Sequence, residues 1–101
     1  MPYFCVHAFD RPDRLADRLH LRETHRARLR LHDHPVTVRI GGPLLDDGEQ
    51  MVGTMLVIEA ETRDAVEAYW AGDPYMTADL FASVSIRRFN WGLGQPEAVS
   101  G

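Results

Sequence analysis

The order in which strand-like and helix-like segments alternate constrains the fold of this chain more than any other feature. Four short segments rich in apolar, β-branched and aromatic residues have the composition of strands. Two longer stretches carry apolar residues three or four positions apart, the spacing of a helix face. The chain is therefore expected to run strand, helix, strand, strand, helix, strand, with strands at 3–8, 36–40, 51–59 and 83–89.

This βαββαβ order is that of a ferredoxin-like α+β fold, in which two helices cover one face of a four-stranded antiparallel sheet. Capping and breaking residues refine the expected boundaries. Asp13 is expected to cap the first helix, whose apolar spacing changes phase near 20–23, so that a bend or break is expected there. Gly41-Gly42-Pro43 is expected to end the second strand. The second helix is expected over 62–72.

The length of 101 residues and the absence of repeats indicate one domain, which we place at residues 1–91. Residues 92–101 contain Gly, Pro and Ser and are expected to form a flexible C-terminal tail. No charged segment followed by an apolar one resembles a secretory signal, so a cytoplasmic location is expected. The longest apolar run, at 51–58, is too short to cross a bilayer, and no membrane association is expected.

The charge distribution argues against nucleic acid as a partner. The formal net charge is -4, and all 11 basic residues are arginine. Four arginines lie at 22, 26, 28 and 30, but acidic residues flank them and weaken their field. We therefore expect a small-molecule ligand rather than nucleic acid.

Apolar residues occupy both faces of the expected sheet. In the first strand, Tyr3, Cys5 and His7 alternate with three other mostly apolar residues, and 51–58 is apolar at almost every position. Two helices can cover only one face, so the other would be exposed unless a second molecule covered it. We therefore expect a homodimer in which the two sheets pack face to face.

The residues that usually bind metals or act as nucleophiles do not form a recognised pattern. Four of the five histidines, His20, His25, His32 and His34, lie close together, but their spacing does not match a zinc site, and neither HExxH nor CxxC occurs. Cys5 lies within an apolar strand, where a thiol is usually inert. No Gly-rich nucleotide motif is present. We expect neither a metal nor a cofactor.

His25 lies on the apolar stripe of the first helix, where a buried imidazole needs a hydrogen-bond partner. In a ferredoxin-like fold the end of the second helix lies beside the first, so Asp73 can approach His25. The carboxylate would fix the tautomer of the ring and leave the other nitrogen free to take or give a proton. The alternative is that His25 is a buried structural histidine and that Asp73 only caps the turn that begins at Pro74.

Several strings in the chain together resemble the YCII-related (YciI-like) family. They are Arg22-Glu-Thr-His25-Arg-Ala-Arg-Leu29, Gly42-Pro43, Asp73-Pro74-Tyr75 and Val84-Ser-Ile86-Arg-Arg-Phe89. The resemblance runs from Tyr3 to about Phe89. It implies a dimeric α+β barrel with a His-Asp active site at His25 and Asp73. It also implies an activity such as the removal of chloride from a chlorinated hydroquinone-type ring, without a cofactor.

This chemistry needs groups that bind the substrate beside the proton-transfer pair. Trp70 and Tyr75, together with Tyr69, are candidates for an aromatic lining, although each could instead be a core residue. Arg22 is a candidate anchor for a carboxylate or phenolate. His7 could reach the same site from the first strand, or could instead face the dimer partner.

Three functional classes follow from these residues. The first is a small cofactor-independent enzyme in which His25, oriented by Asp73, moves a proton on a cyclic or aromatic substrate during isomerisation or elimination. The second is a non-catalytic dimer of the same fold that binds a small ligand or a protein. The third, a haem-using or oxygen-using protein, has the weakest support because no histidine is singled out as an iron ligand.

Overall fold

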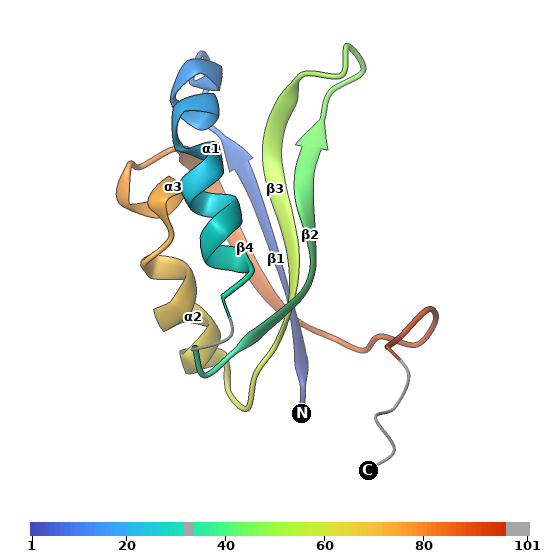
Figure 1. The fold of residues 1–101 in the computed structure, drawn as a ribbon. Coiled ribbons are helices and arrows are strands. Elements are labelled where there is room, and N and C mark those ends of the chain that lie inside the picture. Colours follow the sequence, from blue (N-terminus) through green and yellow to red (C-terminus); the bar gives the residue numbers. More distant parts are fainter. Residues whose placement is uncertain (32–33, 97–101) are drawn as a thin grey trace.

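In a computed structural model, the chain forms a single curved sheet with helices packed against it (Figure 1). The structure describes residues 1–31 and 34–96, so half of the expected C-terminal tail lies outside the described residues. The elements, in chain order, are β1 (Tyr3–Asp10), α1 (Leu15–Leu29), β2 (Thr37–Leu45), β3 (Met51–Glu59), α2 (Arg63–Ala71), α3 (Pro74–Thr77) and β4 (Phe81–Phe89). No helix among the described residues is long and apolar enough to span a membrane.

The four strands form one antiparallel sheet in the order β2-β3-β1-β4. All three helices lie on one side of this sheet (Figure 1). The predicted ferredoxin-like α+β fold is therefore confirmed, with α3 as a short turn of helix between α2 and β4.

The hydrophobic core lies between the sheet and the helices. Alternate residues of β1, namely Phe4, Val6 and Ala8, are almost completely buried on the helix-covered face. The pairing register places Leu56 and Ile58 of β3 beside them on the same face. Helices α2 and α3 and the segment after α3 complete the core with Val66, Tyr69, Trp70, Tyr75, Leu80 and Phe81.

The opposite face of the sheet has no covering element among the described residues and carries apolar side chains. His7 lies on this face, paired with Met55 of β3. Phe9, Ile40 and Phe89 are 46%, 43% and 38% exposed. We call this surface the open face.

Helix α1 differs from the expectation at its start and in its middle. Asp13 does not cap it: Arg14 is the N-cap residue and makes no side-chain capping bond, while Asp13 has a φ of 62°, in the left-handed region. The expected bend near 20–23 is absent, because α1 runs unbroken for 15 residues. The leucine spacing gave a wrong prediction of a bend, because the residues that α1 buries are Arg18 and His25, whereas Leu19 is 51% exposed.

Strand β2 continues through the residues that were expected to end it. It runs to Leu45 and pairs with β3 through Gly41, Gly42 and Pro43. Proline is tolerated because β2 is an edge strand, where a missing N–H leaves no partner unsatisfied. At Gly41 an added Cβ would lie 2.5 Å from Leu56 Cδ2, so the strand packs closely here. The extension of β2 forms one wall of the site described next.

Candidate active site

Two elements position the candidate active site: the middle of α1 and the start of α3. Asp73 caps α3, and its Oδ1 accepts a hydrogen bond from the backbone N–H of Tyr75 at 2.9 Å. Pro74, at the first helical position, needs no partner for a backbone N–H. This local geometry fixes the Asp73 carboxylate while α1 crosses beside it.

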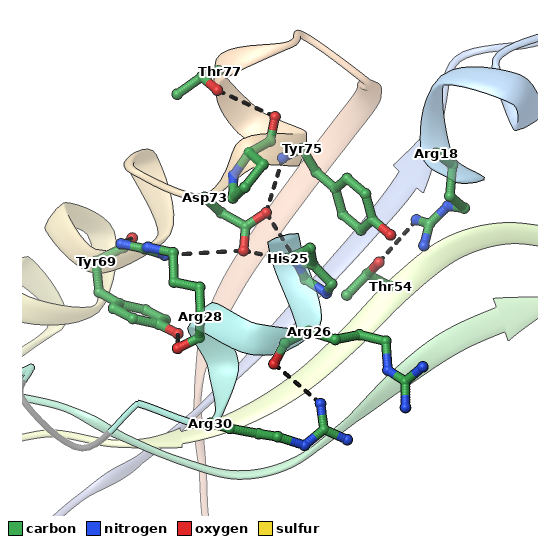
Figure 2. A network of polar contacts seen from close by, with 11 residues as sticks. Arg18, His25, Arg26, Arg28, Arg30, Thr54, Tyr69, Asp73, Tyr75 and Thr77 are labelled. Carbon is green, nitrogen blue, oxygen red and sulfur yellow. Dashed lines mark hydrogen bonds and ion pairs between the residues drawn. The ribbon is translucent and has the colours of Figure 1, made fainter. Parts of the chain in front are cut away.

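His25 of α1 meets the Asp73 carboxylate, 48 positions away in the sequence (Figure 2). Its Nδ1 lies 2.8 Å from Oδ2 and 3.0 Å from Oδ1. His25 is 6% exposed and Asp73 is completely buried. Because a carboxylate only accepts hydrogen bonds, Nδ1 donates, and Nε2 is the ring nitrogen left for a ligand.

Arg28, one turn further along α1, supports the carboxylate from another direction. Its Nη1 lies 3.9 Å from Asp73 Oδ2, and its Nη2 donates to the backbone carbonyl of Tyr69 at 2.7 Å. The guanidinium also stacks over the Tyr69 ring, 4.2 Å from its centroid. Burial raises the pKa of the Tyr69 hydroxyl. Asp73 is thus held on several sides, which restricts the orientation of His25.

The ring of Tyr75 stacks on the ring of His25. Its ring centroid lies 4.1 Å from that of His25, with an angle of 22° between the planes. Tyr75 is completely buried, and its hydroxyl has no hydrogen-bond partner among the described residues. Burial raises the pKa of this hydroxyl, so it remains a hydrogen-bond donor at neutral pH. Figure 2 shows it directed towards Arg18 and Thr54.

A cavity of about 390 Å³ opens between α1 and β2, beside the His25 ring. This volume is within the range of small-molecule sites, about 300–1,000 Å³. Arg22, His25 and Tyr75 line it, together with Arg18, Arg26, Leu29, Arg30, Val38, Arg39, Ile40, Gly41, Gly42, Pro43 and Thr54. Three of the sequence-predicted site residues therefore face one cavity, and Asp73 lies directly behind His25.

Three of the predicted substrate-binding residues do not reach this cavity. Trp70 is 1% exposed and packs in the core, with its ring centroid 6.3 Å from that of His25. Tyr69 is also a core residue. His7 lies on the open face of the sheet, because residues of β1 alternate between the two faces.

Sequence reasoning missed Arg18 and Thr54, which also line the cavity. Arg18 is 2% exposed and donates to both oxygens of Asp10 at 2.7 Å and to Thr54 Oγ1 at 2.8 Å. Its guanidinium lies over the Tyr75 ring, 4.6 Å from the centroid. The signal was present in the sequence: Arg18 and His25 are seven positions apart, which places them on one face of a helix.

Neither His20 nor His34 lines the cavity. His20 is exposed, and His32 lies outside the described residues. Within 1–31 and 34–96, no three His, Cys, Asp or Glu side chains are grouped as metal ligands would be. Burial raises the pKa of the Cys5 thiol, which does not favour the reactive thiolate.

Comparison with known proteins identifies the family of this chain. The model of the YCII-related domain matches residues 1–90. The chain belongs to the YCII-related family. Protein YciI of Escherichia coli O6:H1 is 32% identical over 92 residues, which cover 85% of this chain and 94% of that protein. An uncharacterised protein of Haemophilus influenzae is 30% identical over 93 residues, covering 86% and 95%.

A solved structure that is similar to this chain is that of an enzyme. The 5-chloro-2-hydroxyhydroquinone dehydrochlorinase of Burkholderia phenoliruptrix, in complex with 2,5-dihydroxybenzoquinone, is 32% identical, with a TM-score of 0.75. The alignment covers 87% of this chain and 93% of that one. Rv0793 from Mycobacterium tuberculosis is 15% identical with a TM-score of 0.55, covering 97% and 99%, and shows only the shared fold. The similarity to the dehydrochlorinase supports a small enzyme of the YciI-like fold.

Proposed function

We propose that this protein is a cofactor-independent enzyme in which His25 transfers a proton on a small cyclic or aromatic substrate. The observation that carries the proposal is the buried Asp73 carboxylate, 2.8 Å from Nδ1 of an imidazole that borders a cavity. An acid holding one ring nitrogen while the other faces a ligand is the arrangement of a general base.

The proposed step begins when His25 Nε2 takes a proton from a ring hydroxyl or an acidic ring carbon. The electron pair left behind moves into the ring. In an elimination, His25 returns the proton to the ring carbon that bears the leaving group, and loss of a second hydroxyl proton to His25 then expels the leaving anion with its bonding electron pair. In an isomerisation, a different ring carbon accepts the proton from His25. The Asp73 carboxylate stabilises the imidazolium formed in between, because it accepts the hydrogen bond from Nδ1.

Two features of the cavity favour a hydroxylated ring as substrate. Tyr75 presents a hydroxyl without a partner among the described residues, which can donate to a ring oxygen. Arg22 lines the same cavity and can bind a phenolate through a charge-assisted hydrogen bond. The similar dehydrochlorinase holds a dihydroxybenzoquinone. We therefore place the substrate of this protein in the same class of hydroxylated rings.

The test compares wild type with His25→Gln, which removes the base while an amide can still reach Asp73. Chloride release from 5-chloro-2-hydroxyhydroquinone and binding of 2,5-dihydroxybenzoquinone are measured. Loss of a general base lowers rates about 10²–10⁴-fold, so His25→Gln should lose turnover and still bind the quinone. The matched control is His20→Gln, an exposed histidine of the same helix, which should behave as wild type. Equal turnover in folded His25→Gln contradicts the proposal.

The non-catalytic alternative makes a different prediction for the same proteins. If the His25–Asp73 pair is structural, wild type binds ligands without converting them, and Asp73→Asn lowers the melting temperature with no effect on chemistry. Quinone binding without turnover of any hydroxylated ring would favour this class.

We also propose that the protein is a homodimer joined through the open face. Phe9, Ile40 and Phe89 are between 38% and 46% exposed there, which is unusual for large apolar side chains on a solvated sheet. Sedimentation at micromolar concentration should show a dimer, and Met55→Glu, at the centre of the open face, should yield a monomer. A monomeric wild-type protein contradicts this assembly.

A further inference from the structure

One side of α1 carries a row of arginines that the proposed chemistry does not use in full. Arg18, Arg22, Arg26 and Arg30 are four positions apart and all line the cavity, where Arg39 of β2 joins them. Residues four apart lie above one another on a helix, so the row runs along the length of the cavity. No acidic side chain lines the cavity among the described residues.

The arginines differ in how far their charge is already paired. The charge of Arg18 is paired with Asp10, and that of Arg39 with Glu59. In contrast, Arg22 has no acidic partner among the described residues. Arg30 has no acidic partner there either. The charges of Arg22 and Arg30 are therefore without an ion pair in the described structure.

Arg26 and Arg30 form the outer part of the row. Arg26 has only a 3.5 Å contact with the exposed carboxylate of Glu23. Arg30 reaches back to the backbone carbonyl of Arg26 at 3.1 Å, as Figure 2 shows. Like charges four apart weaken a helix, so the row destabilises α1 unless an anion binds to it. An anionic ligand in the cavity would offset this repulsion.

The positions of these charges specify where the anions would lie. Arg22 is one turn from His25 and belongs to the inner part of the cavity, whereas Arg30 is eight residues further along α1, about 12 Å along the helix axis. Arg26 and Arg30 are neighbours on the helix surface, so one anionic group can contact both. Arg22 is left for the group that binds beside His25. The charges therefore form an inner site beside His25 and an outer site at Arg26 and Arg30.

We propose that the ligand of this cavity is a hydroxylated ring with an anionic side chain, such as a carboxylate, bound by Arg26 and Arg30. The ring binds at Arg22, Tyr75 and His25, as the proposed function requires, and this inference rests on that function. The side chain selects the substrate, and it takes no part in the proton transfer.

The test uses three probes, of which the acid and its ester share one hydroquinone ring, and isothermal titration calorimetry on the intact protein. They are 2,5-dihydroxybenzoquinone, 2,5-dihydroxyphenylacetate and the methyl ester of the latter, which lacks the charge. Wild type should bind the acid about tenfold more tightly than the ester, as one charge-assisted hydrogen bond allows. The preference should weaken as salt is added.

The variant Arg26→Gln/Arg30→Gln should reduce the preference for the acid to less than about threefold and leave quinone binding unchanged. Arg63→Gln removes the same charge from α2, outside the cavity, and should keep the full preference. A folded wild type that binds the quinone but not the acid more tightly than the ester overturns this inference alone, as does a preference that survives the double substitution. Failure of all three probes to bind overturns the proposed function as well.

Discussion

Two polar side chains of helix α1, seven positions apart, point into the protein. Each binds a carboxylate from another element. Arg18 binds Asp10 at the end of β1, and His25 binds Asp73 at the start of α3. Both α1 residues are less than 10% exposed, and both border the same cavity. The two pairs nevertheless differ in what they leave unbonded.

The Arg18 pair binds both oxygens of its carboxylate. Two guanidinium nitrogens bind the two Asp10 oxygens, and Thr54 accepts a further bond. The His25 pair uses one ring nitrogen and leaves the other, and the Tyr75 hydroxyl stacked beside it has no partner. A buried carboxylate whose two oxygens are both bound by one guanidinium contributes to stability, whereas an imidazole nitrogen and a hydroxyl left free next to a cavity can act on a ligand.

The largest expected loss of stability comes from breaking the Arg18–Asp10 pair. Arg18→Met leaves the Asp10 carboxylate buried without its partner, which should lower the free energy of unfolding by about 3–5 kcal/mol. Urea denaturation measures this change. Arg11→Met, which breaks the exposed ion pair with Asp79, should cost about 0–1 kcal/mol. Equal losses in the two variants would show that the Arg18 pair is not the structural one.

The substitution Asp73→Asn tests the His25–Asp73 pair. The amide oxygen can still accept from the Tyr75 backbone, so stability should fall by only about 1–3 kcal/mol. The amide no longer stabilises an imidazolium, and turnover should fall about a hundredfold or more. Urea denaturation and rate measurements on the same protein separate the two effects. A stability loss as large as that of Arg18→Met, with unchanged turnover, would reverse the assignment of roles.

Tyr75→Phe removes a hydroxyl that has no partner among the described residues. Stability should be unchanged or slightly higher, since no protein hydrogen bond is lost and a buried polar group is removed. Affinity for 2,5-dihydroxybenzoquinone should fall about three- to tenfold, the value of one hydrogen bond. Unchanged affinity, measured by calorimetry, would show that the hydroxyl does not contact the ring.

The smallest expected effect is a dependence of stability on alkaline pH. Burial raises the pKa of Tyr75 and Tyr69, so the folded protein holds these protons more tightly than the unfolded chain does. The resulting contribution to the free energy of unfolding is complete below about pH 10, the pKa of tyrosine in the unfolded chain. It is lost as the pH rises through the raised pKa values of the folded protein. The melting temperature should therefore fall above about pH 10, and less steeply in Tyr75→Phe. Identical slopes would contradict a tyrosine origin.

The sequence was sufficient for the element order, and it indicated that Asp73 can approach His25, a contact that the structure contains. It failed where a local signal competes with tertiary packing. The leucine phase in α1 predicted a bend, but the helix instead buries Arg18, which no hydropathy pattern identifies as an inward residue. Similarly, Gly41-Gly42-Pro43 resembles a strand end, and only its place at the sheet edge allows β2 to continue.

Local rules act over a few residues, so the chain itself determined which segments become helix or strand and which residues bear the chemistry. Whether a side chain faces a cavity, the core or the open face depends on partners far away in sequence. Trp70 and Tyr75 are both aromatic residues at the α2–α3 junction, yet only Tyr75 lines the cavity. The tertiary structure alone decided which of the two lines the cavity. Packing against α1 and the sheet leaves space beside the ring of Tyr75 and fills the space around the ring of Trp70.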